Sequence, residues 1–126
     1  MISDNDVILD IPDDPNHGWL AVPDIMERTG ASLSTVRAWL RDHELIGVRR
    51  GSHRALMVPE GFVTEDGPLK HLRGTITVLT DSGLQDDEII DWMHAPDDTL
   101  IGGSPVASLQ AGSKTEVRRR AQETAY

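Results

Sequence analysis

WLAVPDIMERTGASLSTVRAWLRDHELIGVRRGSHRALMVP, residues 19–59, carries the signals that decide the fold. Pro23 suits the first turn of a helix, and Asp24 suits the positive end of the same helix. Gly30 favours the left-handed conformation in which many helices end. Together these signals predict a short helix over about residues 23–29.

A second helix is expected directly after the first. Ser32 is a preferred N-cap residue, and the stretch LSTVRAWLRD that follows it has a helical pattern. Two helices joined by a short turn that contains a glycine are typical of a helix-turn-helix.

The second helix has two distinct faces at about 100° per residue. Leu33, Val36 and Leu40 fall on one stripe, which we expect to pack against the core. Ser34, Arg37 and Arg41 fall on the adjacent stripe, which therefore presents guanidinium groups. For Trp39, at the margin of the apolar stripe, packing is favoured over stacking on a base.

A β-hairpin is expected after the second helix. The β-prone runs LIGVRR and RALMV are separated by Gly51-Ser52-His53, a spacing that is typical of a hairpin turn. Pro59 and Gly61 then end this unit. The tip and shoulders of the hairpin carry four basic or titratable side chains: Arg49, Arg50, His53 and Arg54.

Charge is unevenly distributed along the chain. The net charge is −9, from 12 Lys and Arg against 21 Asp and Glu, yet residues 28–54 hold six Arg against Asp42 and Glu44. This local balance of +4 leaves −13 for the remainder. A helix-turn-helix with a two-stranded wing explains the difference, because arginines bind guanine edges and phosphates. We expect Ser34, Thr35, Arg37 and Arg41 to face bases or nearby phosphates, and Arg49, Arg50, His53 and Arg54 to face the backbone or minor groove.

The second half of the chain has a helical pattern. Leu72, Ile76 and Leu79 recur at helical spacing before Gly83, and QDDEIIDWMH predicts another helix that closes at Pro96. A short helix is expected near 105–110, and KTEVRRRAQETAY predicts a final one. The expected fold is mainly α with a small β-hairpin wing. Its expected parts are an acidic arm, a winged helix-turn-helix and a helical unit: residues 1–18, 19–66 and 67–126.

Other kinds of chemistry lack a motif. The chain has no cysteine, which excludes disulfides and thiolate ligands. The five histidines show no zinc-ligand spacing, and acids such as Asp86 and Asp87 are explained by the helix dipole. We therefore expect no metal, no cofactor and no catalytic residues. The apolar runs are short and the first residues are acidic, which predicts a cytoplasmic protein without membrane contact.

The stretch from residue 19 to 59 resembles the winged helix-turn-helix of the excisionase and MerR type. Together with LTDSGLQDDEIIDWMHAPDDTL and VRRRAQETAY, it looks most similar to a small actinobacterial DNA-binding family. The resemblance covers residues 19–126 and implies a DNA-binding protein with a winged first half and a helical second half. The mycobacterial member of this family is a substrate of a Ser/Thr kinase.

Two departures limit what the resemblance implies. Residues 1–28 contain no threonine, and Ser3 is their only hydroxyl side chain, so an N-terminal phosphothreonine switch does not carry over. Regulation by a Ser/Thr kinase stays open through Ser3 or a later hydroxyl. The chain also lacks the long dimerising coiled coil and the cysteine effector site of MerR regulators.

The C-terminal half has a second resemblance. Residues 91–123 are similar to the toxin-binding segment of some antitoxins, in which a Gly-Gly-x-Pro turn begins a short helix; Gly102, Gly103 and Pro105 match it. The expected function is therefore duplex DNA binding in transcription regulation or nucleoid organisation. The alternative is an antitoxin-like or adaptor module that binds another protein.

Overall fold

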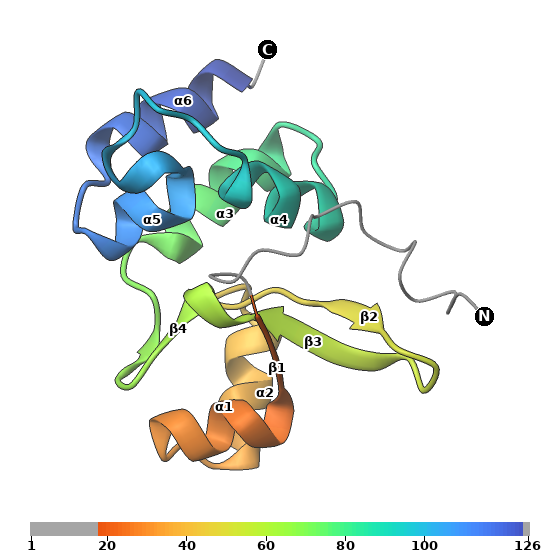
Figure 1. The fold of residues 1–126 in the computed structure, drawn as a ribbon. Helices are drawn as coiled ribbons and strands as arrows, with labels where there is room; N and C mark the ends of the chain where they lie inside the picture. The colour runs from red at the N-terminus through yellow and green to blue at the C-terminus, as the bar shows by residue number, and fades with distance from the viewer. Residues whose placement is uncertain (1–17, 125–126) are drawn as a thin grey trace.

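The computed structural model describes residues 18–124. The acidic arm expected over residues 1–18 lies outside this range except for Gly18. A small β-sheet separates two groups of helices (Figure 1), with α1 and α2 on one side and α3 to α6 on the other.

The first two helices match the expected helix-turn-helix. α1 spans Val22–Thr29 and α2 spans Leu33–Arg41. Gly30 has the expected left-handed conformation (φ 76°), and its N–H donates to the Met26 carbonyl. The backbone N–H of Ala21 donates to the Asp24 carboxylate (2.9 Å), which satisfies one of the free donors at the start of α1.

The wing is part of a three-stranded antiparallel sheet in the order β1-β3-β2. β2 spans Val48–Arg50 and β3 spans Ala55–Pro59, as expected for the hairpin. β1, Trp19–Ala21, pairs with β3 and was not predicted, because its three residues are too short to show an alternating pattern. The chain segment before α1 therefore belongs to the wing sheet.

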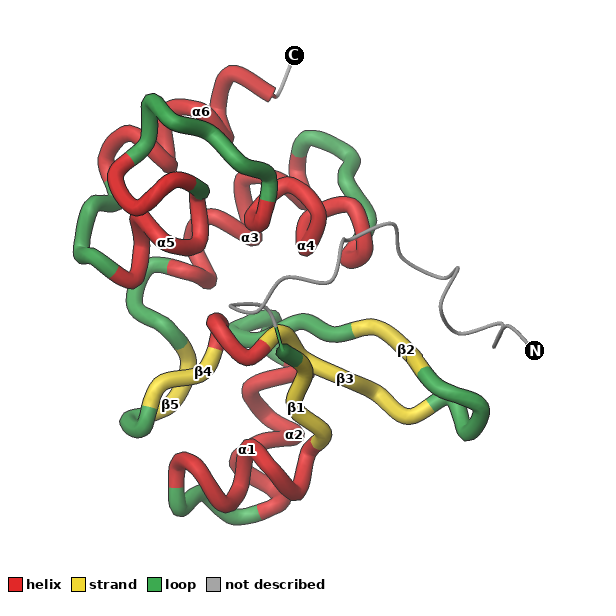
Figure 2. The backbone as a smooth tube through the Cα atoms, viewed as in Figure 1, coloured by secondary structure: helices red, strands yellow, loops and turns green. Residues whose placement is uncertain are grey.

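A second, smaller hairpin follows the wing. β4, Val63–Thr64, pairs with β5, Gly67–Pro68, after the 3₁₀ turn η2 at Glu60–Phe62. The sequence does not predict this hairpin, because strands of two residues carry almost no local pattern. Figure 2 shows the hairpin beside the helix-turn-helix. The side chain of Trp39 packs there, since a Cβ on Gly67 would lie 3.3 Å from its ring.

The remaining helices follow the predicted order. Gly83 follows the end of the first of these helices, and Pro105 begins the short helix, as expected. Gly102 (φ 82°) and Gly103 (φ 92°) form the turn before the short helix. Ser104 caps that helix by accepting from the Ala107 N–H (3.2 Å). The elements are α3 (Leu72–Asp81), α4 (Asp86–His94), the 3₁₀ turn η3 (Ile101–Gly103), α5 (Pro105–Gln110) and α6 (Thr115–Thr124).

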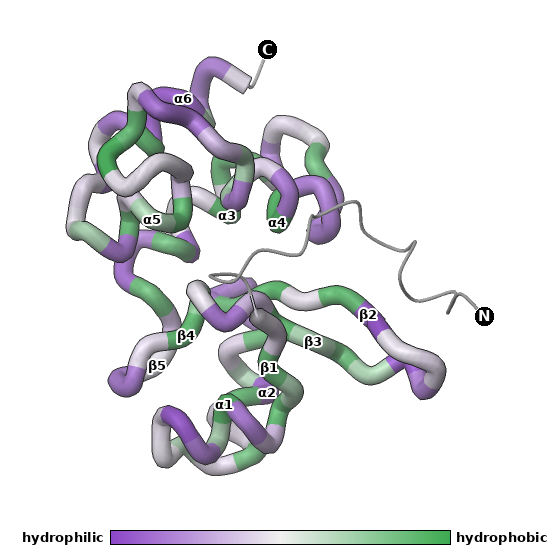
Figure 3. The backbone as a smooth tube through the Cα atoms, in the orientation of Figure 1, coloured by the Kyte–Doolittle hydropathy of each residue, from purple (hydrophilic) through white to green (hydrophobic). Residues whose placement is uncertain are grey.

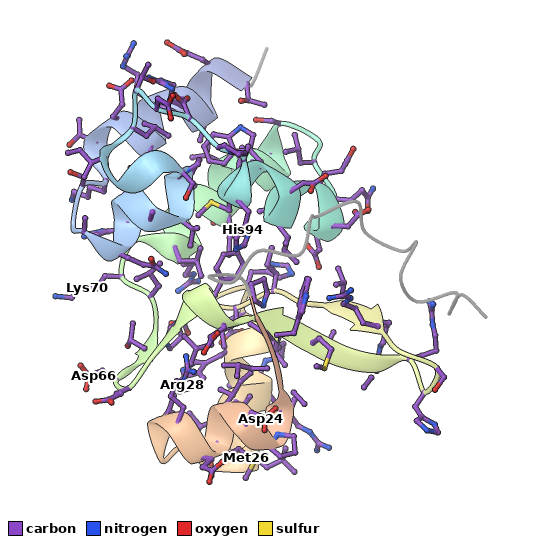
Figure 4. All side chains as sticks on the ribbon, viewed as in Figure 1. Asp24, Met26, Arg28, Asp66, Lys70 and His94 are labelled. Carbon is purple, nitrogen blue, oxygen red and sulfur yellow. The ribbon has the colours of Figure 1, made fainter. Side chains whose placement is uncertain are left out.

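One hydrophobic cluster connects the two groups of helices. It runs from Ile25 and Val36 through Phe62 to Val117. The ring of Phe62 stacks on that of His94 (centroids 5.6 Å apart), which Figure 4 places between the two halves. The Gln110 amide donates to the Gly61 carbonyl (3.1 Å). The winged half is thus packed directly against α4 and α5. No helix in residues 18–124 is both long and apolar enough to cross a bilayer.

Candidate nucleic-acid interface

The N-terminus of α2 is organised by three hydroxyl side chains. The Ser32 hydroxyl accepts a hydrogen bond from the Thr35 N–H (3.2 Å) and donates to the Thr35 hydroxyl (3.0 Å). The hydroxyls of Ser32 and Ser34 lie 3.1 Å apart. Ser34 and Thr35 are exposed. Hydroxyls and free N–H groups at the start of a helix are suited to bind a phosphate or a base edge.

The outer face of α2 carries the two arginines that sequence analysis singled out. Arg37 and Arg41 are exposed, while Val36 on the opposite face is fully buried. Arg41 makes only a long contact with the neighbouring Asp42 (3.4 Å), and 72% of its side-chain surface remains accessible. Both guanidinium groups are therefore available to an external partner.

Leu33, which belongs to the expected packing stripe, is more exposed than predicted. Leu33 is 40% exposed, whereas Val36 is buried and Leu40 packs against the core. Leu33 is the first residue of α2. The packing stripe is therefore shorter than predicted.

The turn of the wing presents its basic residues outward. Gly51 (φ 85°) and Arg54 (φ 55°) both adopt the left-handed conformation, and the Arg54 N–H donates to the Gly51 carbonyl (3.0 Å). Arg49 donates across the hairpin to the Arg54 carbonyl (3.3 Å). Arg49, His53 and Arg54 are exposed. In Figure 3, β2 changes from hydrophobic (green) to hydrophilic (purple) toward the wing turn.

Arg50 has a different environment from the other wing arginines. Its guanidinium carbon lies 4.4 Å from the centroid of the Trp19 ring, and its Nε is buried without a hydrogen-bond partner. This cation–π contact joins β2 to β1 across the sheet. No sequence signal indicated it, because the two residues belong to strands that are far apart along the chain.

Acidic side chains face the wing. Arg49 and Arg54 line an open hollow of about 600 Å³, and Asp86 and Asp87 from the first turn of α4 line the same hollow. The position of these acids in the sequence indicates only their place at the positive end of α4, and their approach to the wing depends on how the two halves pack. Their negative charge lowers the attraction of this end of the wing for phosphates.

Arg28, the first arginine of the basic segment, lies apart from the α2 surface. Its Nη2 is 2.7 Å from the Glu60 carboxylate, and its Nη1 donates to the Val63 carbonyl (3.1 Å). Arg28 therefore ties α1 to the segment that follows the wing, as the labelled side chain in Figure 4 shows.

Potential metal ligands do not gather in the described part of the chain. Across residues 18–124, no group of three or more histidine, aspartate or glutamate side chains is placed to hold an ion. The acids of the α4 first turn are all exposed, and Glu88 instead accepts from the Gln85 N–H (2.7 Å) as a helix cap. This geometry favours a capping role for the acidic run.

Two family models match the chain. Residues 6–63 match the winged helix-turn-helix domain of the DNA-binding protein Rv2175c, and residues 69–125 match the Rv2175c C-terminal domain of unknown function. The boundary between the two matches lies in the β4–β5 hairpin and the loop after it.

A curated protein and a solved structure are similar over almost the whole chain. The DNA-binding protein Rv2175c of Mycobacterium tuberculosis (strain ATCC 25618 / H37Rv) is 35% identical over 133 residues, which cover 96% of this chain and 87% of that protein. The NMR structure of Rv2175c matches with a TM-score of 0.77 and 33% identity, over 93% of this chain and 87% of that one. The winged helix-turn-helix and the helical second half are therefore common to both structures.

Proposed function

The chain belongs to the Rv2175c family, and we propose that it binds duplex DNA with α2 in the major groove and the β2–β3 wing on the phosphate backbone. The relative from Mycobacterium tuberculosis is named a DNA-binding protein. The bulk charge of this chain, −9, opposes such binding. Binding must therefore depend on where the cations lie.

The observation that carries the proposal is the division of α2 into two faces. Val36 anchors one face in the core, while Ser34, Thr35, Arg37 and Arg41 are all exposed on the other. A helix enters the major groove with such a polar face, and arginine pairs there with guanine O6 and N7. Hydroxyls at the helix start contact the adjacent phosphates.

The wing supplies contacts that do not depend on base sequence. The cations of Arg49 and Arg54, with His53 between them, are exposed at its turn. We assign these three side chains to the phosphate backbone or minor groove beside the α2 site. Arg50 contributes through the sheet, because its stacking on Trp19 holds β2 in place.

The role that follows is regulation of transcription or organisation of the nucleoid. A single recognition helix reads only a few base pairs, so high specificity needs a second copy or a partner protein. A DNA-bound protein of this kind acts at the nucleoid, and no enzymatic step is part of the proposal.

Salt-dependent fluorescence anisotropy tests the proposal. The full chain is titrated into a labelled duplex of mixed sequence at several salt concentrations. We expect the logarithm of affinity to fall linearly with the logarithm of salt, with a slope of about −0.9 for each phosphate neutralised. An affinity that is absent at low salt, or that does not change with salt, contradicts DNA binding through these cations.

The alternative is a protein-interaction module. Ile101 is 61% exposed, and it stands next to a hollow of about 320 Å³ lined in part by Trp92, Pro96, Leu100 and Pro105. An exposed apolar side chain beside a partly apolar hollow is typical of a protein contact. This surface lies on the C-terminal helices, so a partner bound there would leave the α2 face free for DNA.

Phosphorylation by a Ser/Thr kinase would act on the same interface. Ser3 lies outside the described residues, whereas Ser34 and Thr35 are exposed hydroxyls on the α2 face. A phosphate there carries close to two negative charges and repels the DNA backbone. Incubation with a kinase followed by mass spectrometry identifies the modified residue, and modification confined to other sites would remove this route.

A further inference from the structure

A second group of cations, with no ion-pair partner among residues 18–124, lies at the start of α3 and α6. Both lysines of the chain belong to it, Lys70 just before α3 and Lys114 just before α6. Arg73 and Arg118 stand in the early turns of the same helices. We call these four residues the α3–α6 cluster.

The packing of α3 on α6 brings Arg118 against the start of α3. A Cβ on Gly74 would lie 2.5 Å from Nη2 of Arg118 and 2.9 Å from its Cζ, so the guanidinium rests directly on the first turns of α3. A glycine inside a helix costs roughly 1 kcal/mol relative to alanine. Here the missing side chain makes room for the charged group of Arg118.

The side chain of His71 lies in the positive field of three of these cations, Lys70, Lys114 and Arg118. Desolvation, and then the charges of Lys114, Arg118 and Lys70, lower the pKa of this imidazole. His71 is exposed and stands at the N-terminus of α3, where no side chain caps the helix and no acid lies in the first turn. The imidazole therefore lies within reach of three cations and the positive end of a helix.

Within residues 18–124, no acid forms an ion pair with the α3–α6 cluster. Among the ion pairs of residues 18–124, Arg119 and Arg120 hold Glu116, Glu123 and Asp97. None of these pairs involves Lys70, Arg73, Lys114 or Arg118. The Nε of Arg118 is buried without a hydrogen-bond partner. In the part of the chain that the structure describes, these four cations thus have no acidic partner.

We propose that the α3–α6 cluster is a second DNA-binding surface, which holds the phosphate backbone of a second duplex segment. This inference rests on the proposed function, because the same class of ligand is bound at α2. A polyanion fits the cluster better than a folded protein does. The two large apolar side chains that are exposed in the described residues, Leu33 and Ile101, are outside it, and protein hot spots need such anchors.

The cluster and the wing lie on different sides of the molecule, so we expect them to bind different segments of DNA. In Figure 1 the connection from β5 to α3, which carries Lys70, lies at the opposite side of the molecule from the wing turn. Figure 4 shows Asp66, at the tip of the β4–β5 hairpin, between Lys70 and α1. A straight duplex on α2 and the wing would therefore meet negative charge before it reached the cluster.

Capture of one duplex by another tests this proposal. A short duplex is fixed to beads and saturated with the full chain, and a labelled duplex is added after washing. The wild type is expected to retain the labelled duplex. The variant Lys70→Gln/Lys114→Gln should retain about tenfold less, because two phosphate contacts are lost. Its affinity for a single duplex, measured by anisotropy, should change less than about twofold.

Two matched variants serve as controls. Lys70→Arg/Lys114→Arg keeps the charge and should capture like the wild type. Arg119→Gln removes a cation from α6 that is already paired with Glu116 and Glu123, and it should also capture normally.

The outcomes separate the second surface from the first. A wild type that binds one duplex but retains no second one overturns the α3–α6 surface and leaves the α2 proposal standing. Equal capture by the Lys70→Gln/Lys114→Gln and Arg119→Gln variants overturns it too, since another contact must then hold the second duplex. A large loss of single-duplex affinity in the double variant also overturns it, because the cluster then serves the same duplex as α2. A chain that binds no duplex at all removes both proposals.

Discussion

The guanidinium of Arg50 lies 4.4 Å from the centre of the Trp19 ring. Trp19 begins β1, whose residues pair with β3, while Arg50 ends β2 on the other side of β3. The contact therefore links β1 and β2, the two edge strands of the small sheet. It gives Arg50 a structural role that Arg49 and Arg54, exposed at the wing turn, do not share.

Arg50→Ala is expected to lower stability more than Arg49→Ala. A partly desolvated cation–π pair contributes about 0.5–2 kcal/mol. The free energy of unfolding, measured by urea denaturation, should fall by a similar amount. Arg49→Ala should leave stability nearly unchanged but weaken DNA binding. Equal stability of the two variants would show that the stacking contributes nothing.

Removal of the acids that face the wing should tighten DNA binding. Asp86→Asn/Asp87→Asn takes two negative charges from the hollow shared with Arg49 and Arg54. Affinity at low salt should rise roughly two- to fivefold, and the gain should shrink at high salt, where charges are screened.

The control for this variant removes the same charge elsewhere. Asp91→Asn/Asp98→Asn removes two exposed carboxylates from the helical second half, and neither residue lines the hollow beside the wing. If both double variants gain affinity equally, net charge alone is responsible, and the position of Asp86 and Asp87 is irrelevant.

Local signals in the sequence predicted much of the fold. The Gly30 turn, the Ser32 cap and the helix over Pro105–Gln110 all lie where the residue types place them. β1 and the β4–β5 hairpin were missed, because strands this short are defined by their pairing with distant segments. The hydrogen-bond partners of such strands are not visible in a local pattern.

For the candidate site too, the sequence predicted the features that depend on local pattern and missed those that depend on distant segments. Exposure of Arg37 and Arg41 follows from helical periodicity and is observed. The stacking of Arg50 on Trp19 and the approach of Asp86 to the wing depend on how separate elements pack. The α3–α6 cluster was missed for this reason too, since Lys70 and Lys114 stand far apart in the sequence.

Gly47→Ala is expected to destabilise the wing. A Cβ at this position would lie 2.5 Å from the backbone oxygen of Met57, which cannot move without disturbing β3. Overpacking of this kind costs about 1–3 kcal/mol. Gly61→Ala is the matched control, because the closest group to its Cβ would be the flexible end of the Gln110 side chain, 2.8 Å away, while Val106 at 3.5 Å lies at ordinary van der Waals distance. Thermal unfolding that ranks the two variants in the reverse order would contradict this account of the wing.

Acid should weaken the attachment of α6. Hydrogen bonds from the Thr99 hydroxyl and N–H, and then from Arg120, lower the pKa of Asp97. Arg119 and Arg120 likewise lower the pKa of Glu116. A carboxyl group with a lowered pKa stabilises the fold above its unfolded pKa of about 4, and this contribution is lost as pH falls through the folded value.

Thermal unfolding from neutral to acidic pH checks this expectation. Arg120→Gln should melt below the wild type at pH 7, and the difference should shrink below about pH 4, where the carboxyl groups become protonated. A difference that stays constant across the whole range would mean that Arg120 acts through packing and not through these carboxylates.

The most direct test of the central claim compares Arg37→Ala/Arg41→Ala with Arg119→Gln. Each protein is titrated into the same labelled duplex at one moderate salt concentration, after circular dichroism has shown that it is folded. The α2 variant should lose most of the affinity, because each lost arginine contact with a base edge removes about 1–3 kcal/mol. Arg119→Gln should bind like the wild type. A folded α2 variant that binds DNA as tightly as the wild type would contradict the assignment of α2 as the recognition helix.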